Sequence, residues 1–301
     1  MGINYKEIES NSVWYKTDYN MNSVDFVEFL WAKGYKESQI EDLYKCMKDL
    51  VPLSKIQYDV MFENFKEYMV IGGLPAIGAK FVTQNNYSGL LDMQKQILLD
   101  YEEDITKYAG GLDQGKILSV YRKIPIFLGN ENKKFQISKI SSESRNREYV
   151  GTIDWLKNSG IINISYCMEN VSLPLGGNYN PDNYRAYFAD TGLLIGSLDE
   201  EVQSNLRENK NFNTYKGAIY EKGTIEMDFF IRDKNSLISV EVKANDNSTV
   251  SLIKLIDNEK YEDIKYGIKL CNKNIGFNGK FYTFPYFMTF LLKKYLRETK
   301  I

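Results

Sequence analysis

The chain of 301 residues carries 38 basic and 40 acidic side chains, a formal net charge of −2. No overall basic field therefore attracts nucleic acid, and any such binding must rest on a local patch. Histidine is absent, which excludes Ser-His and Cys-His pairs, histidine-bound zinc and an imidazole general base. The three cysteines are far apart, so we expect reduced thiols. The N-terminus has no secretory pattern and no apolar run reaches membrane length, which predicts a cytoplasmic protein without a membrane partner.

Helical patterns dominate the first third of the chain. The spacing of apolar residues predicts helices over 23–34, with Ser23 as cap, and over 37–51, 58–70 and 87–108. The segment 73–81 superficially resembles a phosphate-binding loop, but its lysine does not directly follow the second glycine and no Ser or Thr comes next. We expect a helix-breaking turn there, no ATP site in this chain, and a helical region over 1–112.

The middle of the chain has the element order of a winged helix. After a helix with the stripe Ile117 to Ile124, we expect helices at 134–140 and 144–159, then a hairpin of 161–166 with 171–175. These elements define a winged-helix domain over 113–185.

A local excess of positive charge accompanies this domain. Between Glu131 and Arg147 five basic residues face two acids, and a third helix entering a major groove would carry Arg145 and Arg147 near its start. We therefore take Arg145, Arg147 and Lys139 as candidate DNA contacts. The alternative is a purely structural joint between neighbouring domains, since fold does not fix function.

The last third contains a hairpin with a metal-site pattern. An apolar run from Glu226 ends at residue 231, a polar turn comes next, and a second strand runs to Lys243. The period of two places Glu241 and Lys243 on one face of that strand, with Asp228 on its neighbour. Asp228 and Glu241 could hold Mg²⁺ or Mn²⁺, and Lys243 could orient or help deprotonate the attacking water. The same charges also suit an ordinary solvated strand face.

After the hairpin, the pattern predicts a helix at 248–258, a strand at 266–270 and a closing helix from Phe284.

Five segments are together similar to a bacterial and archaeal family of AAA-type ATPases; they are 25–34, 68–75, 154–160, 187–194 and Glu226-Met-Asp-Phe…Glu241-Val-Lys243. The resemblance is to the region C-terminal to the ATPase core, which consists of a helical lid region, a winged helix and a domain of unknown function. It implies an α+β multidomain protein in which residues 186–301 form a PD-(D/E)xK restriction-endonuclease-like α/β domain. The resemblance also implies that Asp228, Glu241 and Lys243 are its motif residues, with Glu226 beside them as a further metal ligand.

The chain also departs from that family. The nucleotide-binding core is missing, and a stretch that the family has between Glu221 and Lys222 is absent, which removes a strand and displaces the helix acid, Glu221 by position. Three functions are therefore expected. The chain is the regulatory, DNA-binding C-terminal part of such an ATPase, or an Mg²⁺- or Mn²⁺-dependent nuclease acting on DNA. The third expected function is that of a non-catalytic module, which binds a separate ATPase subunit or a second copy of itself.

Overall fold

The structure, a computed structural model, describes residues 21–129, 134–137, 140, 148–173, 175–198, 227–233, 236–243, 249–261 and 264–299. It combines helices with mixed strands, so the expected α+β class is confirmed. The chain forms two compact units, each assembled from three stretches. The first unit comprises 1–24, 69–167 and 181–218, and the second comprises 25–68, 168–180 and 219–301. The division into 1–112, 113–185 and 186–301 stays a prediction.

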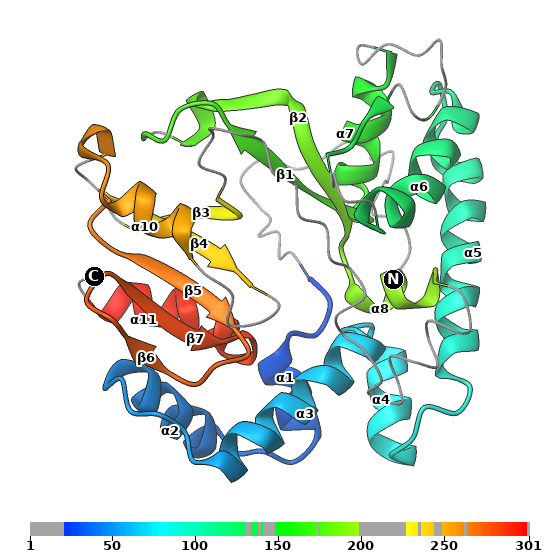
Figure 1. The fold of residues 1–301 in the computed structure, drawn as a ribbon. Coiled ribbons are helices and arrows are strands. Elements are labelled where there is room, and N and C mark those ends of the chain that lie inside the picture. Colours follow the sequence, from blue (N-terminus) through cyan, green and yellow to red (C-terminus); the bar gives the residue numbers. More distant parts are fainter. Residues whose placement is uncertain are drawn as a thin grey trace, which may run out of the picture. The chain divides into compact units, whose positions relative to one another are not determined.

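The first unit is mainly helical (Figure 1). Its elements are α4 (Pro75–Gln84), α5 (Leu90–Tyr108), α6 (Gln114–Gly129), α7 (Val150–Asn158), α8 (Thr191–Gly196) and most of the hairpin β1 (Ile162–Met168) and β2 (Tyr179–Phe188). The turn expected over 73–81 is wrong beyond its first residues, because Pro75 opens α4. Proline suits the first helical position, where its missing N–H is not needed and its fixed φ is already helical.

Two expectations for the winged-helix region need correction. Residues 134–136 are not helical, because the Phe135 amide donates to the Tyr184 carbonyl at 2.8 Å and the Phe135 ring packs between Phe127 and Tyr184. The second hairpin strand begins at residue 179 instead of 171. Val171 and Leu173 instead pack beside Leu237 in the core of the second unit, so burial there outweighs strand pairing.

The second unit contains a five-stranded sheet with helices packed on it. Its helices are α1 (Phe26–Ala32), α2 (Glu37–Lys48), most of α3 (Lys55–Ile71), α10 (Val250–Ile256) and α11 (Leu292–Glu298), with 3-10 turns η4 (Glu259–Tyr261) and η5 (Tyr286–Leu291). Its strands are β3 (Phe229–Asp233), β4 (Ser236–Val242), β5 (Gly267–Cys271), β6 (Gly276–Phe277) and β7 (Phe281–Pro285). Asp25, not Ser23, caps α1, where its side chain accepts from the Glu28 amide.

The sheet order is β3-β4-β5-β7-β6. β3 and β4 form the expected antiparallel hairpin, whereas β4, β5 and β7 run parallel. The strand expected at 266–270 is confirmed as β5. The closing helix expected from Phe284 begins later, as η5 and then α11, since β7 continues to Pro285. β7 is short and largely apolar, and periodicity cannot distinguish such a run from a segment of a buried helix.

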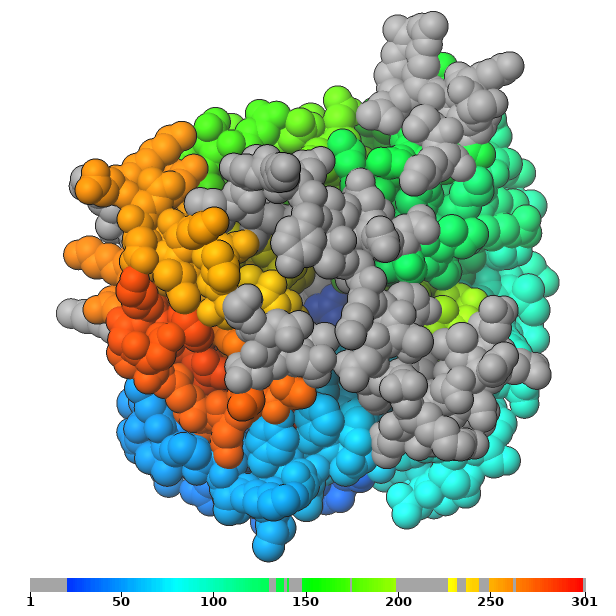
Figure 2. All heavy atoms as spheres, viewed as in Figure 1, coloured from blue at the N-terminus to red at the C-terminus, as the bar shows by residue number. Residues whose placement is uncertain are grey.

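The two faces of the sheet are covered by different helices (Figure 1). α10 covers the face that includes Ser239 and Gly267, where a Cβ on Gly267 would lie 2.4 Å from Leu252. α11 covers the opposite face, with the Tyr295 ring 5.2 Å from that of Phe284. α2 packs on α11 in turn, and Figure 2 shows its blue atoms directly against the orange and red atoms of the C-terminal elements. The face under α10 carries the predicted site.

Candidate functional site

The hairpin brings Asp228, Glu241 and Lys243 together, as the sequence predicted. The register that pairs Phe229 with Val240 places Asp228 opposite Glu241. The Val242 amide donates to Asp228 Oδ2 at 2.8 Å, and Lys243 Nζ lies 2.7 Å from Glu241 Oε1. Two carboxylates and an ammonium therefore share one end of the β3–β4 pair.

Glu241 is the most unusual member of this group. It is only 2% exposed, and its second carboxylate oxygen, Oε2, accepts no hydrogen bond from any residue that the structure describes. Burial is the largest influence on its pKa and raises it. The hydrogen bond and charge of Lys243 and the charge of Lys269 lower that pKa, whereas the charge of Asp228 raises it further. A proton or a cation would be favoured at Oε2.

Lys269 is a fourth member that the sequence interpretation missed. It lies on β5 in register with Glu241 and is 4% exposed. Buried lysines are rare unless they are paired, so its position within the apolar run Gly267–Cys271 was the available signal. With Lys269 included, two positive and two negative side chains balance the cluster.

Tyr286 fixes the backbone beside the site. Its hydroxyl donates to the Lys243 carbonyl oxygen, and the Lys243 amide donates to the Leu270 carbonyl at 2.9 Å. Both peptide groups of Lys243 are thus held, while its side chain stays partly exposed. This anchoring directs the ammonium toward Glu241.

The cluster offers carboxylate oxygens to a hard cation. In the described part of the chain no three acidic, cysteine or histidine side chains form a metal-binding group. A pair of carboxylates is nevertheless sufficient for Mg²⁺, which keeps several water ligands. Glu226, the third predicted ligand, lies outside the described residues, and so do the predicted DNA contacts Lys139, Arg145 and Arg147.

A second buried cluster joins two of the five family-like segments within the first unit. Asp190, 4% exposed, accepts hydrogen bonds from the amides of Gly73 at 2.7 Å and Gly192 at 2.8 Å. The Ser23 side chain and the Leu193 amide also bond to it. A Cβ on Gly72 would lie 2.0 Å from Asp190 Oδ1, so these glycines permit the close approach. Asp190 is the N-cap residue of α8, and the sequence Asp-x-Gly at the start of that helix was the available signal for the cap.

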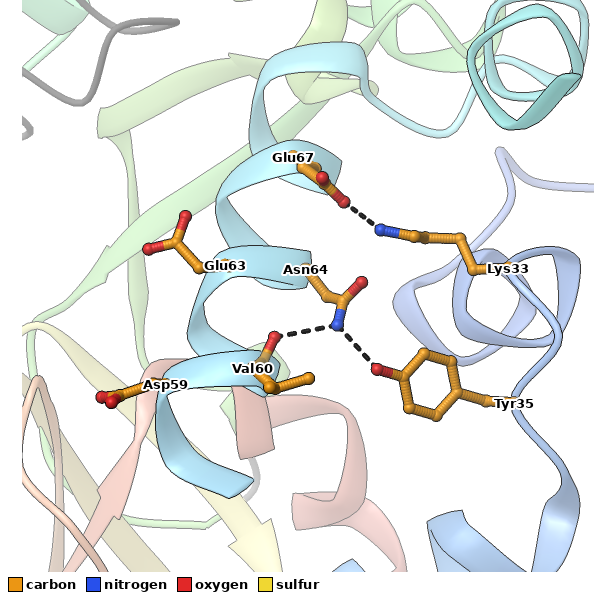
Figure 3. A pocket seen from close by; sticks show the side chains of 7 residues that line it. All are labelled: Lys33, Tyr35, Asp59, Val60, Glu63, Asn64 and Glu67. Atoms are coloured by element: carbon orange, nitrogen blue, oxygen red, sulfur yellow. Dashed lines mark hydrogen bonds and ion pairs between the residues drawn. The ribbon is translucent and has the colours of Figure 1, made fainter. Parts of the chain in front are cut away.

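A groove beside α3 contains polar side chains that already have partners (Figure 3). Asn64 donates to the Tyr35 hydroxyl at 2.9 Å and to the Val60 carbonyl at 2.8 Å. Its three acids are each paired with a lysine; the pairs are Lys55–Asp59, Lys66–Glu63 and Lys33–Glu67. Because each acid already has a lysine partner, the groove offers no unpaired carboxylate that indicates chemistry.

Comparison with known proteins adds one match. Residues 62–204, just under half of the chain, match the model of a family described as a domain of unknown function (DUF8612). The match includes Gly73, Asp190 and Gly192 but not Ser23, and it ends before Asp228. Searches of the curated proteins and of the solved structures gave no match. In the described part of the chain no helix is both long and apolar enough to cross a bilayer.

Proposed function

We propose that Asp228 and Glu241 bind one Mg²⁺ or Mn²⁺ ion in a nuclease-like domain that cleaves phosphodiester bonds of DNA. The observation that carries this proposal is the buried Glu241 Oε2 without a donor among the described residues, in a carboxylate whose pKa is raised by burial and also by the charge of Asp228. A buried acceptor without a partner costs about 1–3 kcal/mol, and more when it is charged. A cation shared by the two carboxylates would remove that cost.

The topology around the site supports a PD-(D/E)xK-like domain. An acid directly precedes β3, the Glu-x-Lys triplet spans the end of the antiparallel β4, and α10 then crosses to the parallel strand β5. This order places the acids and the lysine at one end of adjacent strands, as the family resemblance implies. The observed strands thus bring together the charged groups that such chemistry requires.

Each side chain of the cluster has a distinct role in the proposal. Asp228 and Glu241 would hold the cation, which when bound would act as a Lewis acid on a phosphate oxygen. Lys243 would orient the attacking water and stabilise negative charge that develops on the phosphate. Lys269 would limit the charge of Glu241 before the cation binds.

Calorimetric titration with Mn²⁺ tests the binding step. We expect one ion per wild-type chain, and at least tenfold weaker binding in Asp228→Ala and Glu241→Gln. Glu259→Ala removes an exposed carboxylate of the same unit and should bind like wild type. Equal binding in all four proteins would mean that the ion sits elsewhere, and no binding to wild type would overturn the metal site.

Cleavage of labelled DNA in Mn²⁺ then tests the reaction. We expect activity that Asp228→Ala and Lys243→Ala abolish and Glu259→Ala retains. Activity that survives Asp228→Ala would come from a contaminant or another site. Metal binding without cleavage would separate the cation site from the proposed chemistry.

The charge balance with Lys269 favours a second candidate, a non-catalytic interaction module. Its partner would be a separate ATPase subunit or a second copy of the chain, as expected for the C-terminal part of an AAA-type ATPase. The succession α6, α7 and the β1–β2 hairpin supports a winged helix in that module. Failure to bind Mn²⁺ together with a dimer in sedimentation would favour this function over the nuclease.

A further inference from the structure

The last part of the second unit is strongly basic although the whole chain is slightly acidic. Residues 264–297 contain no Asp or Glu and seven basic residues. The basic residues are Lys265, Lys269, Lys273, Lys280, Lys293, Lys294 and Arg297. The rest of the chain therefore carries 31 basic and 40 acidic side chains. This is the kind of local patch on which nucleic-acid binding by an acidic chain must rest.

The fold gathers several of these residues at one end of the sheet. Lys265 lies two residues before β5, and Lys280 lies just before β7, where its carbonyl accepts from the Gly267 amide. After β7, the chain returns through α11 on the sheet face, with Tyr295 in ring contact with Tyr282 at 6.1 Å. The last turn of α11, which holds Arg297, therefore lies near the same end of the strands.

Of the seven basic residues, three have an acidic neighbour, three make no ion pair with a described residue, and Lys273 also has an interaction partner. Lys269 is buried beside Glu241, Lys280 pairs with Asp257, and Lys294 pairs with Glu41. By contrast, three exposed residues make no ion pair with any residue that the structure describes; they are Lys265, Lys293 and Arg297. Lys293 and Arg297 are four residues apart and share one face of α11.

An exposed aromatic platform accompanies these charges. The Phe277 ring stacks on that of Tyr282 with centroids 4.5 Å apart and an interplanar angle of 28°, and Tyr266 lies 6.1 Å from Phe277. Phe277 is 43% exposed. The Asn278 side chain accepts from the Lys280 and Phe281 amides, which fixes the turn that presents the ring.

We propose that this surface, formed by Lys265, Tyr266, Phe277, Tyr282 and Arg297, binds single-stranded nucleic acid. A base would stack on Phe277, and the cationic side chains would contact the adjacent phosphates. Aromatic rings beside basic groups are the elements by which proteins hold single strands, because every base offers a planar face. An acidic peptide would match the charge but would not need the ring.

This binding surface is separate from the Asp228–Glu241 site. Tyr282 is in register with Ile268 and Val240, on the face opposite to Glu241. Neither a cation nor cleavage enters the binding step. The surface would thus retain a nucleic-acid strand whether or not the proposed nuclease function is correct.

Fluorescence anisotropy with a labelled oligothymidylate of about 20 nucleotides tests the surface, in EDTA so that no metal chemistry contributes. We expect Phe277→Ala to weaken binding roughly 5- to 100-fold. The double variant Lys265→Ala/Arg297→Ala should lower the slope of log affinity against log salt by about 1.4, because each phosphate contact contributes about 0.7.

Two variants of the same unit serve as matched controls. Trp31→Ala removes an aromatic side chain of similar exposure, 47%, and Lys36→Ala removes an exposed lysine. Both should bind like wild type, and equal melting temperatures will exclude unfolding. Absence of wild-type binding, or a Phe277→Ala protein that binds unchanged, would overturn the proposal. Competition by heparin combined with that unchanged variant would identify a general polyanion surface instead.

Discussion

Replacement of Asp190 by alanine should strongly destabilise the first unit. The change removes the acceptor for the Gly73 and Gly192 amides, which lie 2.7 and 2.8 Å from the carboxylate. It also removes the bonds to the Ser23 side chain and the Leu193 amide. The donors remain buried without a partner, and this arrangement connects the chain before α4 to the start of α8.

The size of the effect can be worked out from these contacts. A hydrogen bond to a charged group contributes about 1.5–3 kcal/mol, so the two amide bonds together correspond to roughly 3–6 kcal/mol. Burial raises the pKa of Asp190, although the four hydrogen bonds lower it. The carboxylate thus bears a desolvation cost that its loss would recover, and we expect about 3 kcal/mol. Asp190→Asn keeps one acceptor oxygen and should cost less.

Urea unfolding measures this loss. Trp155 is buried in the first unit. When Trp14 and Trp31 are changed to Phe, it is the only tryptophan left, and its fluorescence then follows the unfolding of this unit. Asp100→Ala, on the exposed side of α5, should change the free energy of unfolding by less than about 0.5 kcal/mol. An Asp190→Ala loss as small as that of the control would refute the inferred role of the carboxylate.

Two further predictions concern the cation site. Because a proton competes with the cation and burial raises the pKa of Glu241 above its usual 4.5, Mn²⁺ affinity should fall about tenfold per pH unit below that raised pKa. Glu241→Gln should abolish this slope in calorimetry. Tyr286→Phe removes the donor to the Lys243 carbonyl, so it should slow cleavage severalfold in single-turnover assays while Mn²⁺ affinity stays within twofold.

The sign of the stability effect at Glu241 depends on the same pKa. A carboxyl whose pKa is higher in the folded than in the unfolded chain favours folding below the unfolded value. That contribution is lost as the pH rises through the folded pKa. Without a cation, ionised Glu241 therefore lowers stability at neutral pH. A bound cation should recover stability, which melting in Mn²⁺ against EDTA can measure.

The site could be predicted where it depends on local pattern. The period of two in a strand and a short polar turn suffice to place Glu241 and Lys243 on one face, with Asp228 on the adjacent strand. A lysine within the apolar run Gly267–Cys271 indicates a buried, paired side chain, but neither its pairing with Glu241 nor the contact of Tyr286 could be predicted, because both depend on the parallel register of β5 and β7 with β4. No sequence period encodes the pairing of strands that a crossover separates.

The same limit applies to the fold. Helices such as α2 and α5 can be predicted from their own apolar stripes, whereas the closing helix was expected from Phe284, although β7 continues to Pro285, because the apolar run continues across that boundary. Asp190 and Gly73 are 117 residues apart, so their hydrogen bond could not be predicted from either segment alone. Phe135 likewise pairs with Tyr184 instead of adopting a helical conformation.

The energetic cost of the Glu241 cluster bears on the choice between the two proposed functions. Lys269 balances the charge, but a nearby charge is not a hydrogen bond, and Glu241 Oε2 still lacks a donor among the described residues. Well-packed apolar residues of similar size are often as stable as buried ion pairs, or more so. A module used only for contacts would therefore fold at least as well with an apolar strand face. Cation binding would explain why a carboxylate oxygen without a donor is buried there, whereas the interaction function gives no reason for it.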